Sequence, residues 1–499
     1  MAQLKNTPGV YVEEVNAHPD SVVQVPTAIP AFIGYTEKAL WGAKPLDSQP
    51  IRIGSCAEFS AIFGGPPSPK VRLRKNGDAL DIDGIEQRTR FFLHGSMRLY
   101  FDNGGGPCWV VSVGSYEAAM AAGKSGAALH EALRTLETYP EPTMIVIPDA
   151  VLLESPEQCT AVAQEVLAHC AKMQSRIGIL DVYEGNLKRT HDPATDVISG
   201  ATGLRSLVSD FLNYGVAYYP WLNTSLTEEG EVDYGALTDD GKTLLASYLK
   251  GEAARLYADM PKPAALEESI DRITAADDEQ ARRANHDTLA AAVPAYKTLM
   301  VAVRTELDVM PPSAAMAGVY VRIDHAIGVH KAPANTGIAS AVSPTVAITH
   351  EEQEDLSVPL NGMAVNAIRM LPGRGLLIWG ARTLDANSQD WRYVNVRRTV
   401  IMLEQSIKTA CQSYAFEAND ALTWSNVRSM IGNFLANQWK VGVLIGAKPE
   451  DAFSVDVGLG STMTANDLLD GYMQVVVKVS IVRPAEFIDI RVQQPMPKF

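Results

Sequence analysis

Two apolar stripes with helical spacing lie near the end of the chain. The first stripe consists of Val400, Leu403, Ile407, Ala410 and Tyr414. The second stripe consists of Trp424, Val427, Ile431, Phe434 and Leu435. Steps of three and four residues place each set on one face of a helix, so the pattern predicts two amphipathic helices. Thr423 stands where a side-chain cap of the second helix is expected.

Strand-like runs follow these two helices. The runs are rich in β-branched and aromatic residues and are separated by Gly, Pro, Asn and Asp. They cover residues 441–447, 453–459, 473–482 and 486–493. The last run comes after Pro484 and close to the final residue, so it is either a protected edge or a strand offered to a neighbouring subunit.

The first residues of the chain show the same feature. GVYVEEV at residues 9–15 is a short candidate strand after Pro8, and a His-Pro-Asp turn at 18–20 separates it from PTAIPAFIGYT at 26–36. Both terminal strands either pair inside their own domain or exchange between subunits. The candidate inter-subunit arms are Val10, Tyr11, Val12 and Glu13 at one end and Phe487, Ile488, Asp489, Ile490, Arg491 and Val492 at the other.

The middle of the chain has an α/β pattern. Residues 142–150 and 175–185 are predicted strands, and residues 156–173 between them have helical periodicity. Glycine-rich segments at 103–106 and 199–203 are predicted turns. Strand, helix and strand in this order indicate an α/β unit.

Seven ordered blocks resemble one family, the sheath proteins of contractile tails found in myophages, contractile bacteriocins and extracellular contractile injection systems. The blocks are PGVYVEEV (8–15), PTAIPAFIGYT (26–36), GGGPCWVVSV (104–113), PPSAAMAGVYVRID (311–324), GVHKAPAN (328–335), LNGMAVNAIRMLPGRGLLIWGARTL (360–384) and nearly all of 391–499. Their order is that of the family. The resemblance implies an α/β (α+β) fold with a C-terminal sheath domain of two helices and a β-sheet completed by terminal strands.

The resemblance also implies a domain organisation. An N-terminal arm (1–25) precedes a middle α/β domain (26–334), which is followed by the sheath domain (335–483) and a C-terminal arm (484–499). Two segments of the middle domain depart from the family pattern, at about 71–90 and 226–300. Both are expected to be insertions.

The second insertion is strongly charged. Residues 226–290 contain 15 acidic and 7 basic side chains. Glu268 and Arg272, Asp278 and Arg282, and Glu279 and Arg283 are spaced for i,i+4 ion pairs. We therefore expect a solvated helical insertion without a continuous apolar face, on the outside of a cylinder.

Composition restricts the function classes. A net charge of −15 argues against nucleic acid as the main ligand, because phosphate binding needs clustered basic side chains. The five cysteines are scattered, which predicts neither a disulfide framework nor a zinc site. The sequence shows no secretory signal and no apolar run long enough to span a bilayer, so a cytoplasmic protein without membrane insertion is expected.

An enzyme is the alternative from another class. Asp149 and Asp181 each follow a predicted strand, and paired aspartates at the carboxyl ends of parallel strands can hold Mg²⁺ for phosphoryl chemistry. No accompanying Lys, Thr or Ser motif supports this reading. His169, Cys170, His191 and Asp192 fit no metal-binding spacing. No catalytic residue and no cofactor are predicted.

The predicted function is structural. The resemblance implies a homo-oligomeric helical or hexameric sheath that surrounds an inner tube, contacts baseplate and cap proteins, and drives the tube through a target envelope. A tube or shell protein is the structural alternative. Basic residues of the C-terminal region are the candidate tube contact, with Lys440 and Lys448 first. Arg397 and Arg398 belong to the same basic set, and the alternative is that they are solvated or paired within the domain. The sequence does not distinguish a phage from a bacteriocin or an injection system.

Overall fold

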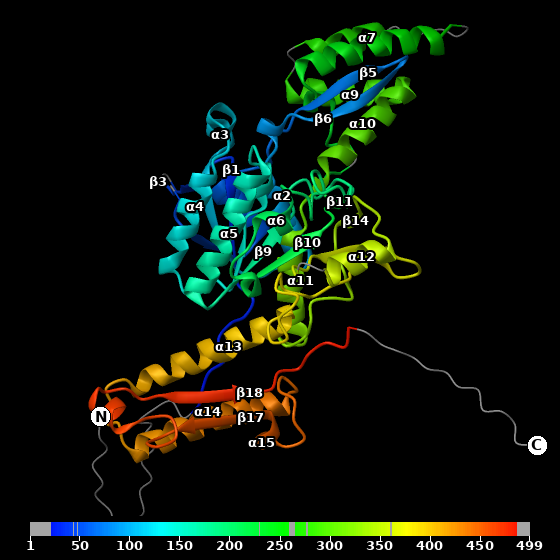
Figure 1. Ribbon diagram of the computed structural model, residues 1–499. Coiled ribbons are helices and arrows are strands. Elements are labelled where there is room, and N and C mark those ends of the chain that lie inside the picture. Colours follow the sequence, from blue (N-terminus) through cyan, green and yellow to red (C-terminus); the bar gives the residue numbers. More distant parts are fainter. Residues whose placement is uncertain are drawn as a thin grey trace, which may run out of the picture. The chain divides into compact units, whose positions relative to one another are not determined.

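The computed structural model describes residues 21–42, 44–46, 48–228, 230–258, 265–275, 278–359 and 362–486, and its contacts divide them into two units (Figure 1). The smaller unit contains Thr399–Val482 together with the described residues before Pro26. The larger unit contains Pro26–Arg398 and the described residues from Arg483 onward. The chain therefore enters the smaller unit, leaves it, returns to it and leaves it again.

A nine-stranded mixed sheet forms the centre of the larger unit, in the order β13-β16-β15-β10-β9-β8-β1-β7-β4. The strands are β1 (Pro30–Thr36), β4 (Ile51–Ile53), β7 (Cys108–Ser115), β8 (Met144–Val146), β9 (Ile177–Asp181), β10 (Gly215–Tyr219), β13 (Thr336–Gly337), β15 (Asn366–Leu371) and β16 (Gly375–Ile378). The strands from β15 to β7 are parallel, while β4, β16 and β13 add antiparallel edges. Every residue of β1, β9 and β10 is buried, as expected for parallel strands covered on both faces.

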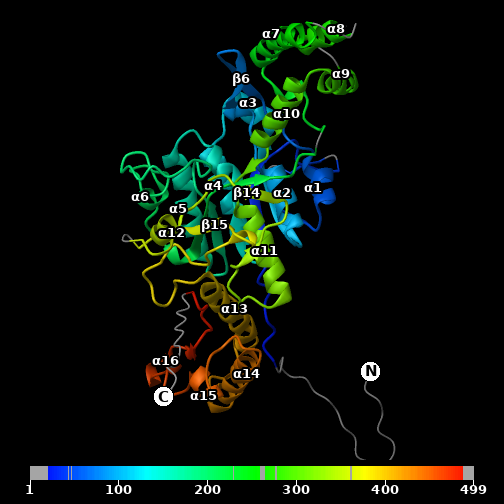
Figure 2. The same ribbon diagram turned by 90° about the vertical axis from the view of Figure 1, so that its right-hand side faces the viewer.

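Helices cover both faces of this sheet (Figures 1 and 2). Helices α2 (Leu93–Asp102) and α11 (Ser313–Ala326) pack together on one side, and α4 (Gly126–Thr135) and α5 (Pro156–Met173) pack together on the other. Gly318 allows α11 to approach α2 closely, because a Cβ there would lie 2.4 Å from the Tyr100 carbonyl oxygen. The predicted α/β unit is confirmed, since α5 has the predicted bounds and β8 and β9 are parallel.

Shorter elements complete this body. They are β2 (Leu40–Trp41), β3 (Lys44–Pro45), α1 (Cys56–Phe63), α3 (Tyr116–Ala122), α6 (Leu204–Leu207), β11 (Leu222–Thr224), β12 (Val309–Met310), β14 (Ala341–Pro344) and α12 (His350–Ser357). Strands β12, β11 and β14 form a small antiparallel sheet. Among the residues that the structure describes, no helix is both long and apolar enough to cross a membrane.

A helical module is formed by the two segments that depart from the family pattern. Its elements are β5 (Val71–Asn76), β6 (Ala79–Ile85), α7 (Asp239–Leu256), α8 (Leu266–Asp271), α9 (Glu279–Ala292) and α10 (Pro294–Leu307). The β5–β6 hairpin packs on α7 and α10 (Figure 1). Val71, Leu245, Leu249, Leu289 and Tyr296 are fully buried in one shared apolar core.

The prediction that residues 226–290 lack a continuous apolar face did not foresee this core, to which the segment contributes many buried side chains. These apolar side chains are spread over three helices and are completed by the hairpin, so no single stretch of sequence shows a continuous stripe. The predicted exposed ion pairs Glu268–Arg272 and Glu279–Arg283 are present, each at 2.7 Å. Arg282 instead pairs with Asp233 at 2.8 Å, which ties α9 to the segment before α7.

The smaller unit contains most of α13 (Val394–Cys411), α14 (Ala421–Lys440), α15 (Pro449–Ala452), β17 (Phe453–Val457), α16 (Ala465–Leu469) and β18 (Val475–Val479). Both predicted amphipathic helices are confirmed, and Leu403, Ala410, Val427, Ile431 and Leu435 are buried. The cap of the second helix differs from the prediction. Asp420, not Thr423, accepts hydrogen bonds from the first free N–H groups of α14.

Two of the predicted strands lie in this unit as β17 and β18, but the strand predicted at 441–447 is absent. Gly442 adopts φ +83° directly after α14 and turns the chain. Leu444 then makes only an isolated bridge to Ile481. The apolar character of this run reflects the burial of Val443 and Leu444 and not strand formation.

The boundary between the units also differs from the one expected at residue 335. The chain after this position adds β15 to the large sheet through the parallel pairing of Tyr218 with Asn366. Strands β16 and β13 extend the same edge. The contacts of the larger unit consequently continue to Arg398.

We predict that the helical module can be removed only as a whole. Its two entry points are closed by hydrogen bonds, from Thr227 Oγ1 to Asp308 Oδ1 at 2.6 Å and from Glu86 N to Lys70 O at 2.7 Å. Replacing both 71–85 and 228–307 by short Gly/Ser linkers should leave a soluble body, because closing such loops costs little. Replacing only 228–307 exposes Val71, Leu73 and Ile85 and should reduce the soluble fraction.

Soluble yield and thermal unfolding of the two deletion variants provide the measurement. Equal solubility of both variants would show that the hairpin does not depend on the helices. Aggregation of the double deletion alone would show that the module supports the rest of the larger unit.

Candidate assembly surfaces

A two-stranded antiparallel sheet is the central feature of the smaller unit. Its register runs from Phe453 opposite Val479 to Val457 opposite Val475. Ser480 N donates to Ala452 O at 2.9 Å, which continues the ladder by one pair. Because N–H and C=O groups alternate in direction along an antiparallel strand, residues 453, 455 and 457 and residues 475, 477 and 479 direct theirs to the outer edges.

Neither outer edge of this sheet pairs with another strand within the described part of the chain. The Val457 carbonyl accepts from Arg428 Nη2 at 2.5 Å. The remaining outward donors and acceptors form a row that is a template for an added strand. The sheet therefore presents two edges, each of which can accept one extended segment. The predicted arm residues Val10 to Glu13 and Phe487 to Val492 lie outside the described residues, so their exchange stays a prediction.

Exposed apolar side chains are concentrated in the smaller unit. Among the described residues, it contributes nine of the twenty large apolar side chains that are most exposed, although it is much the shorter of the two units. They are Val23, Phe416, Leu422, Val441, Ile445, Leu459, Leu469, Tyr472 and Val476. Exposed apolar side chains in this proportion are typical of a surface that becomes covered in an assembly.

The two lysines proposed for tube contact are both exposed. Lys440 is the last residue of α14, and Lys448 precedes α15. The structure shows no ion pair for either lysine with another described residue. They do not bracket a strand, because the segment between them is a turn followed by a single bridge.

Arg397 and Arg398 are not available for such a contact. Both are buried within the larger unit. Arg397 stacks over the rings of Tyr214 and Trp391, with its guanidinium carbon 4.8 and 4.3 Å from the ring centroids. Arg398 forms a bidentate ion pair with Asp324 at 2.9 and 2.6 Å. Of the two alternatives for these arginines, the structure therefore supports pairing within the protein.

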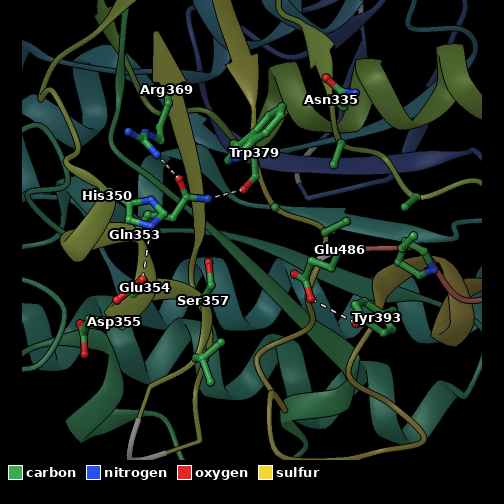
Figure 3. Close-up of a pocket in the computed structure, with 17 residues that line it drawn as sticks. Asn335, His350, Gln353, Glu354, Asp355, Ser357, Arg369, Trp379, Tyr393 and Glu486 are labelled. Carbon is green, nitrogen blue, oxygen red and sulfur yellow. Dashed lines mark hydrogen bonds and ion pairs between the residues drawn. The ribbon is translucent and has the colours of Figure 1, made fainter. Parts of the chain in front are cut away.

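A cavity of about 920 Å³ lies in the larger unit, between α12 and the segment that carries Trp379 (Figure 3). Gln353 links its two sides, since it donates to the Trp379 carbonyl at 2.9 Å and accepts from Arg369 at 2.5 Å. The last described residues, Pro484, Ala485 and Glu486, also line the cavity. The chain toward the predicted C-terminal arm thus starts at its wall.

Asp149 and Asp181 do not form the magnesium site of the alternative enzyme hypothesis. Asp149 accepts hydrogen bonds from the backbone N–H groups of Tyr35 at 2.8 Å and Phe92 at 2.6 Å. Asp181 accepts from the N–H and the hydroxyl of Ser313 at 2.9 and 2.5 Å. Each carboxylate therefore satisfies the free N–H groups at the start of a helix, α2 or α11, in place of binding a ligand.

Burial governs the ionisation of both aspartates. It raises the pKa of Asp149 to about 6, despite the N–H groups of Phe92 and Tyr35 that favour the charged form. Burial likewise raises the pKa of Asp181 to about 7, against the two hydrogen bonds from Ser313. Groups of at least three potential metal ligands are absent from the described residues. His169 is buried and contacts Arg176 at 3.2 Å, and burial lowers its pKa to about 4.

Sequence reasoning missed the cavity and two ion pairs of buried arginines. Arg382 donates to Glu486, which is 104 positions away, and Arg398 pairs with Asp324, which is 74 positions away. The only signal was indirect. Residues 483–488, RPAEFI, lie in the block 391–499 that carries the family resemblance, but nothing in them indicates an intramolecular partner for Glu486.

The comparisons with known proteins agree with this geometry. Residues 386–494 match the family of the phage tail sheath C-terminal domain. The contracted helical sheath of the anti-feeding prophage is 25% identical, with coverage of 99% of this chain and 100% of that chain and a TM-score of 0.62. The contracted sheath complex of the extracellular contractile injection system PVC is also 25% identical, with 99% coverage of both chains and a TM-score of 0.58.

A chain of the anti-feeding prophage baseplate, at 24% identity, 99% and 100% coverage and a TM-score of 0.61, shares the fold. No curated protein matched the sequence. The resemblance to contractile tail sheath proteins and the predicted α/β fold are confirmed. The comparisons support a structural sheath protein, and the metal-dependent enzyme gains no support.

The raised pKa of Asp181 predicts a specific pH dependence of stability. A carboxyl whose pKa is higher in the folded state than in the unfolded state binds its proton more tightly when folded, so stability falls as the pH rises toward the folded value. Between pH 5 and pH 8, Asp181, with a pKa of about 7, and Asp149, with a pKa of about 6, should each lower stability as the pH rises. Buried His169, with a pKa of about 4, acts in the opposite direction below about pH 6.5. Relative to the unmodified protein, the Asp181→Asn variant should therefore lose less stability over the same range.

Denaturant unfolding midpoints of the soluble protein at several pH values measure this difference. Asp192→Asn, at an exposed position, is the matched control and should retain the original slope. The same slope in Asp181→Asn would mean that Asp181 stays ionised in the folded protein.

Proposed function

We propose that this chain, whose C-terminal part matches the phage tail sheath domain, is the structural subunit of a contractile sheath. Many copies polymerise around an inner tube and contract to drive the tube through the envelope of a target cell. The subunits are made in the cytoplasm of the producing cell and assemble with baseplate and cap proteins into a tail or a contractile particle. The function is mechanical and requires no cofactor.

One observation carries the proposal. The smaller unit has a sheet of only two strands, with two open edges, and the sequence predicts two terminal arms with strand character. One arm from each of two neighbouring subunits completes a four-stranded sheet. Backbone ladder bonds do not depend on side-chain fit, so such a mesh keeps its connections while the larger units move during contraction.

Electron microscopy of the purified protein tests the proposal directly. A sheath subunit is expected to form hollow cylinders, alone in a contracted form and with the tube in an extended form. Neither a shell protein nor a metal-dependent enzyme is expected to do so. Failure to polymerise under any condition, with or without the tube protein, would contradict the proposal.

We predict that the outer edges of the small sheet are needed for assembly. Val477→Pro removes an N–H group that is directed to the outer edge and leaves the ladder with β17 in place. The variant should fold as a soluble monomer or small oligomer and form no long sheaths. Val455→Pro should do the same at the other edge, and Val477→Ala, which keeps the N–H group, should still assemble.

The arms themselves give the complementary test. Removing residues 1–15, ending the chain at Pro484, or introducing Val12→Pro should each block long sheaths while the monomer stays folded. Particle length in micrographs and circular dichroism of the soluble fraction are the measurements. Normal contractile particles from any of these three variants would exclude exchange of that arm.

We predict that tube contact depends on exposed basic side chains. Lys440→Glu combined with Lys448→Glu should weaken co-assembly with the tube, because it reverses the charges that form the proposed ion pairs. Exposed ion pairs contribute only about 0 to 1 kcal/mol each and are sensitive to salt. Sheath-only polymers should still form. The control is the pair Lys44→Glu and Lys75→Glu, which changes the net charge equally at two exposed positions of the larger unit.

Co-sedimentation of the tube with sheath variants at low and high salt measures the effect. Equal tube binding by both double variants at every salt concentration would remove Lys440 and Lys448 from the contact.

A further inference from the structure

The chain passes between the two units three times, and each passage lies beside a polar contact on the larger unit. The passages are Val25 to Pro26, Arg398 to Thr399 and Val482 to Arg483. At the first two, the buried Arg398–Asp324 pair joins both connections, because Arg398 Nη2 also donates to Thr27 O at 3.0 Å and Thr27 Oγ1 donates to Asp324 at 2.6 Å. The third passage has its own contact at Glu486.

We call this third contact the Glu486 anchor, formed by Arg382, Tyr393 and Glu486. Arg382 Nε donates to Glu486 Oε1 at 2.8 Å and Nη2 donates to Oε2 at 2.5 Å. The Tyr393 hydroxyl donates to Oε2 at 3.1 Å, and Figure 3 shows this bond at one side of the cavity. Two parallel donors from a guanidinium fix the orientation of a carboxylate as well as its position.

The backbone around Arg382 is held in place by contacts that do not involve Glu486. Asn366 on β15 accepts from Arg382 N at 2.7 Å and donates to Arg382 O at 2.8 Å, and it also donates to Ala217 O on β10 at 3.1 Å. Gly380 permits this approach, since a Cβ there would lie 2.7 Å from Asn366 Oδ1. The anchor is thereby connected to two central strands of the large sheet.

We infer that Arg382 is a positioning residue for the C-terminal arm. It holds Glu486, the last described residue, and so fixes where and in which direction the chain leaves the larger unit. The side chains of Arg382 and Glu486 differ in how far they are exposed to solvent. The Arg382 side chain is 4% exposed and that of Glu486 is 24% exposed, so moving Glu486 away leaves a buried guanidinium without its carboxylate.

The consequence for assembly rests on the proposed function. The arm that is proposed to pair with a neighbouring subunit begins directly after Glu486. A fixed starting point restricts the volume that the arm searches, which raises its effective concentration at one neighbouring edge. The same contact transmits a pull on the arm to the central sheet of the larger unit, through Asn366.

The anchor can be tested on the soluble full-length chain without any polymer. Spin labels are placed on cysteines introduced at the exposed positions Ala161, on α5, and Ala485, in a background of Cys56→Ser and Cys411→Ser. Pulsed electron paramagnetic resonance then reports the distance distribution between the labels. We expect one narrow distribution in this reference chain and a broad one after Glu486→Gln.

Two further variants calibrate the result. Tyr393→Phe removes one of the bonds to Glu486 and should broaden the distribution less. Asp390→Asn removes only the exposed pair with Arg483, at 3.8 Å, and should leave the distribution unchanged. Tyr393→Phe also tests the anchor if Glu486→Gln does not fold. An unchanged distribution in both Glu486→Gln and Tyr393→Phe would overturn the anchor.

Assembly is measured separately, by micrographs of the same variants. Loss of long sheaths in Glu486→Gln, with circular dichroism showing that the soluble protein stays folded, supports a role in positioning the arm. Normal sheaths from a chain with a broadened distribution would overturn that role. If the reference chain itself forms no sheaths, the proposed function fails, while the distance measurement still decides the anchor.

Discussion

A two-stranded sheet is at best marginally stable in water on its own, and this constraint shapes the smaller unit. Strands β17 and β18 pair with each other and pack beside α14, but their outer edges have no strand partner among the described residues. Alternate side chains of β18, such as Val475 and Val477, are only half-buried. Added strands would therefore stabilise this unit. They would also cover exposed apolar side chains.

The edges of the large sheet, unlike those of the small sheet, are protected against the addition of further strands. Its long central strands are covered on both faces by helices, and the outermost strands are very short, with two residues in β13 and three in β4. Short edge strands are a common protection against unwanted pairing. The proposed strand addition therefore has its open edges at the small sheet, although the large sheet has many more strands.

Sequence periodicity predicted the helices that bury one continuous apolar face of a single segment. Helices α5, α13 and α14 follow their apolar stripes closely, because each buries one continuous face. The pattern failed where partners are distant in sequence. The apolar positions of the helical module are divided among several short elements, and the hairpin that completes their core lies about 150 residues earlier in the chain.

Charged residues show the same limit. Arg397 and Arg398 resemble surface residues in sequence, yet aromatic rings and Asp324 allow their burial. Asp149 and Asp181 follow strands as expected of a ligand site, but each is used by a helix that starts elsewhere in the chain. Composition and spacing identify a charged side chain, whereas only the tertiary fold decides whether its partner is protein, water or a ligand.

The helical module shows how a large addition leaves the central sheet intact. Its two segments leave and rejoin the body at positions that hydrogen bonds hold together, at Thr227 and Asp308 and at Lys70 and Glu86. Its apolar side chains are buried mainly against one another, with Val71 and Leu289 in the same core. Because the two segments share this core, the module constitutes one structural addition encoded in two places.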